Sequence, residues 1–155
     1  MPTTSPTSPD TAAPGTCTTL RVRYCECDPM GVAHHASFIP WLEIARTEAL
    51  RQSGQTYAQM EAQGTFLVVT TLDVRYRRPV RYDDVLRITC RACLAGRARL
   101  RHDYEIELVE AGDGNTARLA EMPLALATTQ LACVDTSGRP TPMPQALRAL
   151  IGSQD

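Results

Sequence analysis

The sequence predicts a single α+β domain in which one amphipathic helix precedes a run of antiparallel strands. Apolar residues recur at three- and four-residue spacing between Phe38 and Ala49, which is the period of a half-buried helix. Apolar and polar residues alternate over several later segments, which is the period of half-buried strands. With 155 residues, the chain fits one domain. We therefore expect an antiparallel sheet wrapped around a central helix.

The first segment, residues 1–16, is rich in proline, threonine and serine and predicts a disordered tail ahead of a domain spanning 17–155. It lacks the charged and apolar regions of a secretory signal, and no apolar run is long enough to cross a bilayer. We expect a cytoplasmic protein that does not bind membranes. Alternation over 20–25 then predicts a strand that ends at the Asp28-Pro29 turn.

The central helix is marked by its apolar stripe and by a proline. Pro40 is tolerated only in the first turn of a helix, so the helix should begin near Ala36 or Ser37. Ser53-Gly54 should end it. Trp41 lies on the stripe and is expected in the core. The remaining elements follow in order: a short helix at 56–62, strands at 66–76, 86–94, 98–108 and 117–135, and a terminal helix within 142–151.

Composition excludes several classes of function. The net charge of −1 offers no basic surface for nucleic acid, and the absence of lysine excludes Schiff-base and P-loop chemistry. The six cysteines do not form a disulfide framework in a cytoplasmic protein, and most are expected as small buried fillers. On a strand, Cys90 and Cys93 point to opposite faces, and the adjacent His34 and His35 diverge on a helix. No metal site is therefore expected.

The stretch from Asp28 to His35 leads directly into the central helix. This order places the Asp28 carboxylate beside the free N–H groups and the positive dipole end of a helix N-terminus. A carboxylate that faces such donors is suited to attack a carbonyl and to stabilise the resulting oxyanion. From the residues alone, an Asp-Pro turn or a helix cap is the alternative interpretation of Asp28.

Two segments carry a resemblance to a known family. The first is Asp-x-x-Gly-Val-x-x-His followed by an aromatic residue, Trp-x-Glu and Ala-Arg-x-Glu, and the second is Tyr-x-x-Pro followed by Tyr-Asp-Asp-Val-Leu. Together they resemble the 4-hydroxybenzoyl-CoA thioesterase branch of the hot-dog fold family, over roughly residues 18–136. The matching positions are Asp28, Gly31, Val32, His35, Phe38, Trp41, Glu43, Ala45, Arg46, Glu48, Tyr76, Pro79 and Tyr82–Leu86.

The resemblance implies a hot-dog domain that hydrolyses an acyl- or aroyl-CoA thioester. Coenzyme A is then part of the substrate, and no other cofactor and no metal is required. By resemblance, Asp28 either attacks the thioester carbonyl or activates a water, and the backbone N–H of His35 points at the thioester oxygen. Substrate contacts are expected from Gly31, Val32, His34 and Glu43, although an ordinary surface pair with Arg46 is an equal alternative for Glu43. Ser37 departs from the asparagine often found in this family.

The resemblance also implies a homodimer or homotetramer. Arg97, Arg99 and Arg101 share one strand face, which could meet the phosphates of coenzyme A, a neighbouring subunit or solvent. Three alternative functions stay open at this point. They are hydrolysis of thioesters on an acyl carrier protein, a dehydratase or hydratase, and a non-catalytic module that binds acyl-CoA.

Overall fold

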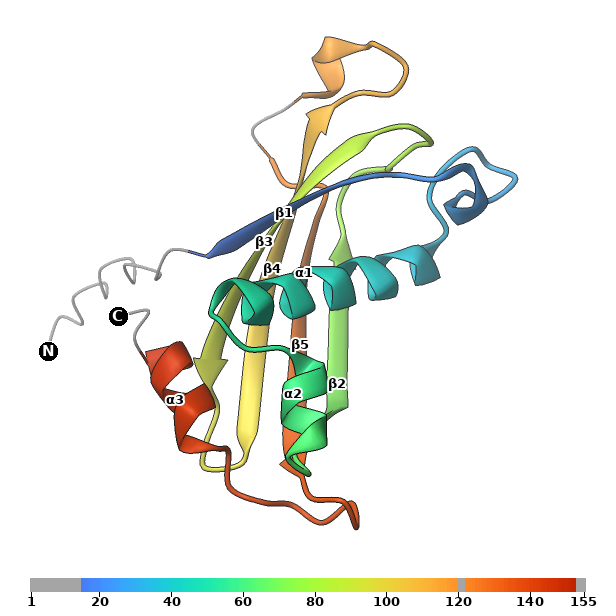
Figure 1. Ribbon diagram of the computed structural model, residues 1–155. Helices are drawn as coiled ribbons and strands as arrows, with labels where there is room; N and C mark the ends of the chain where they lie inside the picture. Colours follow the sequence, from blue (N-terminus) through green and yellow to red (C-terminus); the bar gives the residue numbers. More distant parts are fainter. Residues whose placement is uncertain (1–14, 120–121, 153–155) are drawn as a thin grey trace, which may run out of the picture.

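The computed structural model describes residues 15–119 and 122–152, which form one antiparallel sheet with three α-helices (Figure 1). The sheet has the strand order β1-β3-β4-β5-β2. The strands are β1 (Thr16–Arg21), β2 (Phe66–Tyr76), β3 (Val85–Leu94), β4 (Arg99–Glu110) and β5 (Ala125–Val134). The α-helices are α1 (Phe38–Gln52), α2 (Tyr57–Ala62) and α3 (Gln145–Gly152), and short 3₁₀ helices lie at Tyr24–Glu26, His35–Ser37 and Thr116–Arg118.

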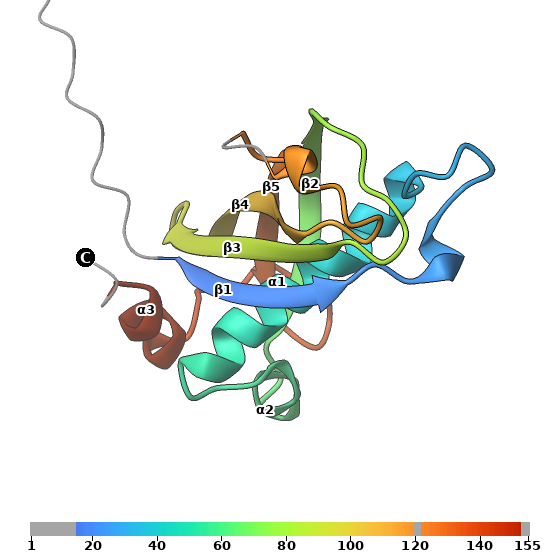
Figure 2. The same ribbon diagram turned by 90° about the horizontal axis from the view of Figure 1, so that it is seen from above.

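Helix α1 packs across one face of the curved sheet, as the two orthogonal views show (Figures 1 and 2). Its apolar stripe supplies Phe38, Trp41 and Leu42 to the core, and Trp41 is 1% exposed. The sheet supplies buried residues such as Ile88 and Ile106 to the same cluster. Burial of side chains of this size stabilises the fold by about 1.5–3 kcal/mol each. The predicted α+β domain, with its sheet wrapped around a central helix, is confirmed.

The first predicted strand was wrong at both ends, because β1 spans Thr16–Arg21 and not 20–25, and the last predicted strand was wrong at its start. Strand β1 ends at Arg21 because the chain turns into the 3₁₀ helix Tyr24–Glu26, where a carboxylate oxygen of Glu26 accepts the Arg23 N–H at 2.7 Å. Strand β5 begins only at Ala125, after a loop that contains the 3₁₀ helix Thr116–Arg118. The predicted tail lies outside the described residues, apart from Gly15 and the first residue of β1.

The cysteines also differ from the expectation. All six are free thiols, as expected, but only Cys90 and Cys133 are buried. Cys17, Cys25 and Cys93 are exposed because they lie near the ends or on the outer face of their elements. Among the described helices, none has the length and apolarity needed to span a bilayer.

A buried ion pair holds the connection between β2 and β3. The Asp84 carboxylate is fully buried and accepts two bonds from the Arg118 guanidinium, at 2.9 and 2.5 Å. It also accepts the backbone N–H groups of Arg81 at 2.8 Å and Gly112 at 2.9 Å. Satisfying a buried carboxylate in this way keeps the 77–84 segment in one conformation. That segment in turn forms one wall of the pocket described next.

Candidate active site

The Asp28 segment forms a tight turn whose two arms are joined by backbone hydrogen bonds. The Asp28 N–H donates to the Val32 carbonyl, and the Gly31 N–H donates to the Asp28 carbonyl, both at 2.9 Å. Gly31 has a φ of 77°, a conformation that is strained for other residues. The Ala33 N–H donates to the Val80 carbonyl at 2.7 Å, which fixes the turn against the 77–84 segment. Asp28 is thus held at the base of the turn.

The helix start leaves one backbone donor free. His34 precedes the 3₁₀ helix His35–Ser37, and its Nδ1 accepts the Ala36 N–H at 3.1 Å while its carbonyl accepts the Ser37 N–H at 2.9 Å. Within the described ranges, the N–H of His35 has no such acceptor. The helix therefore begins where the sequence predicted, to within two residues, and Pro40 lies in the first turn of α1.

Asp28 and His35 line the same pocket. This pocket has a volume of about 390 Å³ and lies between the Asp28 turn, the start of α1 and the end of β2. Its lining is mixed in polarity and includes one carboxylate, that of Asp28. The lining residues are Asp28, Val32, Ala33, His35, Phe38 and Tyr76–Val80.

Tyr76 is a pocket residue whose function the sequence did not indicate beyond its place in a motif. Its hydroxyl donates to the His35 carbonyl at 3.0 Å, and its ring stands edge-on to Phe38 with centroids 4.9 Å apart. Both contacts tie the end of β2 to the start of α1. They orient the His35 peptide from a strand that is forty-one residues away in sequence.

Of the other residues predicted to contact the substrate, some line this pocket and some do not. Val32 lines it, and Gly31 shapes the turn beside it. The His34 ring caps the helix start and stacks on His35, with centroids 4.1 Å apart. Glu43 is not among the lining residues, and its exposed carboxylate accepts Arg46 Nη2 at 3.1 Å. The roles proposed for these residues stay predictions.

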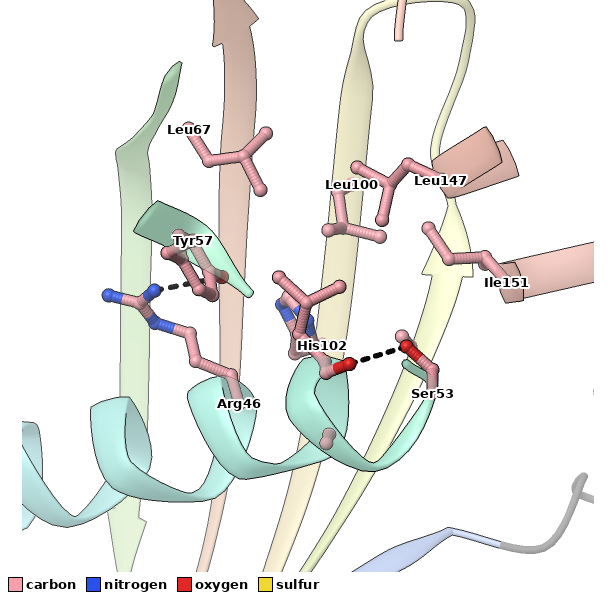
Figure 3. Close-up of a pocket in the computed structure, with 11 residues that line it drawn as sticks. Arg46, Ser53, Tyr57, Leu67, Leu100, His102, Leu147 and Ile151 are labelled. Carbon is pink, nitrogen blue, oxygen red and sulfur yellow. Dashed lines mark hydrogen bonds between the residues drawn. The ribbon is translucent and has the colours of Figure 1, made fainter. Parts of the chain in front are cut away.

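A second cavity lies between the far end of α1, the sheet and helix α3 (Figure 3). Its walls are mostly aliphatic, and four polar residues line it: Arg46, Ser53, Tyr57 and His102. Arg46 Nη1 donates to the Tyr57 hydroxyl at 3.0 Å. The volume of about 30 Å³ admits only a few small atoms, so this cavity does not accommodate a substrate of acyl-CoA size. The Asp28 pocket is the candidate active site.

His102 is buried in that second cavity with a ring nitrogen, Nδ1, that has no hydrogen-bond partner among the described residues. Burial, with a smaller contribution from the nearby Arg46 cation, lowers the pKa of His102 to about 4. The imidazole is therefore neutral at pH 7. Among residues 15–119 and 122–152, no three histidine, cysteine, aspartate or glutamate side chains come together as metal ligands.

Comparison with known proteins identifies the family. The family model described as the thioesterase-like superfamily matches residues 22–151, which is most of the chain. The acyl-CoA thioesterase YbgC of Haemophilus influenzae is 31% identical over 132 residues, covering 84% of this chain and 89% of the relative. The chain therefore belongs to the thioesterase-like superfamily.

Other curated relatives match over a shorter stretch. The acyl-CoA thioester hydrolase YbgC of Escherichia coli is 39% identical over 69 residues, covering 44% of this chain and 52% of the relative. The chain thus spans about half the length of several relatives that it matches.

Solved structures support the hot-dog fold expected from the resemblance. The DHNA-CoA thioesterase of Staphylococcus aureus superposes with a TM-score of 0.71 at 28% identity, covering 82% of this chain and 79% of that one. The hypothetical protein TT1821 of Thermus thermophilus gives 0.78 at 27% identity, covering 90% and 98%. Slr0204 of Synechocystis, a 1,4-dihydroxy-2-naphthoyl-CoA thioesterase, gives 0.76 at 20% identity, covering 88% and 94%, which shows the fold alone.

The neutral state of His102 predicts a dependence of stability on pH. Because its folded pKa of about 4 lies below the ordinary value of 6.5, the unfolded chain binds the proton first as the pH falls. The free energy of unfolding should therefore decrease between pH 7 and pH 4, with His102 responsible for about 3 kcal/mol of the loss.

Urea denaturation of wild type and His102→Gln across this range measures the effect. His102→Gln should lose less stability than the wild type on acidification. Parallel curves for wild type and His102→Gln would contradict this prediction.

Proposed function

We propose that the chain hydrolyses acyl- or aroyl-CoA thioesters to the free acid and coenzyme A, with Asp28 and the His35 N–H as the reacting and stabilising groups. The observation that carries the proposal is that a carboxylate and a free backbone donor line one pocket, in a member of the thioesterase-like superfamily. Relatives named acyl-CoA thioesterases favour coenzyme A as the carrier of the acyl group. Coenzyme A is part of the substrate, and the chemistry needs no further cofactor.

The thioester would bind with its carbonyl oxygen toward the His35 N–H. As the carbonyl carbon becomes tetrahedral, negative charge develops on that oxygen, and a fixed N–H donor stabilises it without reorganisation. Loss of one such donor typically costs on the order of 10²–10³ in rate. The N–H is held in place because Tyr76 fixes the carbonyl of the same residue and His34 caps the neighbouring N–H groups.

Asp28 would supply the electron pair by one of two routes. In the first, its carboxylate attacks the carbonyl carbon, the C–S bond breaks, the thiolate leaves and takes a proton, and water hydrolyses the resulting anhydride. In the second, the carboxylate accepts a proton from a water that attacks the same carbon. Both routes end with the carboxylic acid and the thiol of coenzyme A. Asp28 accepts the Met30 N–H through one oxygen, Oδ1, at 2.9 Å.

The edge of the sheet suggests a homodimer, or a homotetramer built from it. Among the strands that the structure describes, β2 pairs only with β5 and is one of the two outer strands of the sheet. An edge strand presents unpaired N–H and C=O groups that another chain can extend. The apolar side chains Val68, Val69, Leu72 and Tyr76 are also exposed along it. Because Tyr76 lines the Asp28 pocket, a partner on this edge would lie beside the site.

A cytoplasmic location, which suits a substrate made of coenzyme A, stays a prediction from the sequence. An acyl carrier protein in place of coenzyme A is the main alternative, since both present the same thioester on a pantetheine arm. A non-catalytic module that binds acyl-CoA is the alternative from another class.

The first prediction of this proposal concerns Asp28. Wild type should release free thiol from at least one member of a panel of short-chain, long-chain and aromatic acyl-CoAs, and Asp28→Asn should reduce kcat by about 10³ or more. Asp73→Asn, an exposed carboxylate on β2, is the control and should retain activity. Turnover of acyl carrier protein thioesters alone would favour that alternative. Binding without any turnover by the wild type would favour the non-catalytic module.

The second prediction concerns the β2 edge. In sedimentation equilibrium, wild type should have at least twice the 17.0 kDa mass of the chain. Leu72→Lys should shift it toward the monomer, because a buried and unpaired ammonium destabilises an interface. Val109→Lys introduces the same charge at an exposed apolar position of β4 and should leave the mass unchanged. A monomeric wild type, or equal dissociation of both variants, would contradict the proposed interface.

A further inference from the structure

Glu26 is a buried carboxylate that the proposed chemistry does not use. It lies two residues before Asp28, is 8% exposed and belongs to the 3₁₀ helix that ends β1. Its Oε1 accepts Trp41 Nε1–H at 3.0 Å, and Arg23 donates to the same oxygen from Nε at 3.1 Å and Nη2 at 2.8 Å. Its Oε2 accepts the Arg23 backbone N–H at 2.7 Å. Four donors therefore converge on one carboxylate.

The backbone of the same residue contacts the helix start. The Glu26 carbonyl accepts the His34 N–H at 2.8 Å and the Ser37 hydroxyl at 2.8 Å. One residue thus joins three parts of the candidate site: the arm that carries Asp28, the cap that leaves the His35 N–H free, and the first turns of α1 through Trp41. The next residue, Cys27, pairs with Ala33 as an isolated antiparallel bridge and extends the same connection.

We propose that Glu26 is a positioning residue of this site. It holds the Asp28 carboxylate and the His35 N–H in the relative position that lets both act on one thioester group. The inference rests on the proposed function for its kinetic consequence and on the hydrogen bonds above for its geometry. Glu26 does not line the pocket, so it acts through the groups that it holds and not on the substrate. A displacement of about 1 Å between reacting groups can cost on the order of 10² in rate.

An ionised carboxylate is the group that this position requires. Burial raises the pKa of Glu26, but the hydrogen bonds from Arg23 and Trp41 outweigh burial and lower it below its ordinary value. The side chain is therefore an anion at neutral pH and can accept all four bonds. A glutamine has one acceptor oxygen, and its NH₂ group would face an N–H donor. Replacing Glu26 by glutamine should therefore break contacts on one side of the carboxylate.

A purely structural role would give a different result from a positioning role. If Glu26 only stabilised the fold, its loss would lower the free energy of unfolding and leave the kcat of folded molecules unchanged. If it positions the site, its loss lowers kcat in molecules that remain folded. KM should then change little, because Glu26 does not contact the substrate. The two readouts separate the roles.

The first experiment uses nuclear magnetic resonance and needs no activity. Trp41 is the one tryptophan of the chain, so its indole N–H gives a single resonance in ¹⁵N-labelled protein. In Glu26→Gln, this resonance and the His35 amide resonance should both move. In the matched control Glu48→Gln, which loses a half-buried carboxylate paired with Arg51 on the same helix, both should stay in place. Unchanged resonances in Glu26→Gln would overturn the proposal.

The second experiment measures kinetics on an acyl-CoA that the wild type hydrolyses. Glu26→Gln should lower kcat by about 10- to 100-fold with KM within about threefold, and Glu48→Gln should match the wild type. In the Asp28→Asn background, Glu26→Gln should cause little further loss, because both changes disable the same step. The positioning role would be overturned if the losses in kcat from Glu26→Gln and Asp28→Asn were fully additive in the double variant, or if Glu26→Gln alone left kcat unchanged.

A milder variant covers the case in which Glu26→Gln does not fold. Ser37→Ala removes only the hydroxyl that donates to the Glu26 carbonyl, and should shift the His35 amide and lower kcat by a smaller factor in the same direction. No shift and no change in kcat would overturn the proposal. If the wild type hydrolyses no thioester at all, the proposed function fails, while the resonance experiment still decides whether Glu26 positions the Asp28 turn.

Discussion

The structure of this site depends on how the N–H groups at the start of a helix are satisfied. The first turn of any helix has donors without partners inside the helix, and each must find an acceptor or face solvent or ligand. Here His34 supplies two acceptors, one from its ring and one from its backbone, and these take the N–H groups of Ala36 and Ser37. Within the described residues the His35 N–H has no such acceptor, and His35 and Asp28 line the same pocket. Much of the surrounding structure holds these two groups together.

Packing gives the site its rigidity. Phe38 and Trp41, in the first turns of α1, are buried against the sheet, so the helix start cannot shift without opening the core. Tyr76 adds a hydrogen bond and an aromatic contact from the edge strand. On the opposite side, the Asp84–Arg118 pair holds the segment whose Val80 carbonyl anchors the Asp28 turn. Loops that carry function are usually mobile, and this one is fixed from several elements.

Local patterns predicted the parts of the fold that depend on local periodicity. The apolar stripe predicted the helix, and Pro40 predicted where it starts. Alternation predicted the long strands, and these elements are present. The proximity of Asp28 and His35 also followed from their spacing before the helix.

The remaining features depend on contacts between distant residues. Asp84 and Arg118 are 34 positions apart, and Tyr76 is 41 positions from His35, so no local pattern reports either contact. No sequence pattern indicates a role for Glu26, because its contact with Trp41 exists only in the fold. The end of β1 at Arg21 likewise follows from the 3₁₀ helix Tyr24–Glu26, in which Glu26 accepts the Arg23 N–H.

In the proposed mechanism, the thioester carbonyl binds at the His35 N–H. A ketone analogue of an acyl-CoA, in which a methylene group replaces the thioester sulfur, keeps the carbonyl and cannot be hydrolysed. Titrating this analogue into ¹⁵N-labelled protein tests the claim through the backbone amide resonances. The His35 amide should shift most, together with residues of the Asp28 turn. Shifts confined to the second cavity around His102 and Leu147, with the His35 amide unmoved, would contradict it.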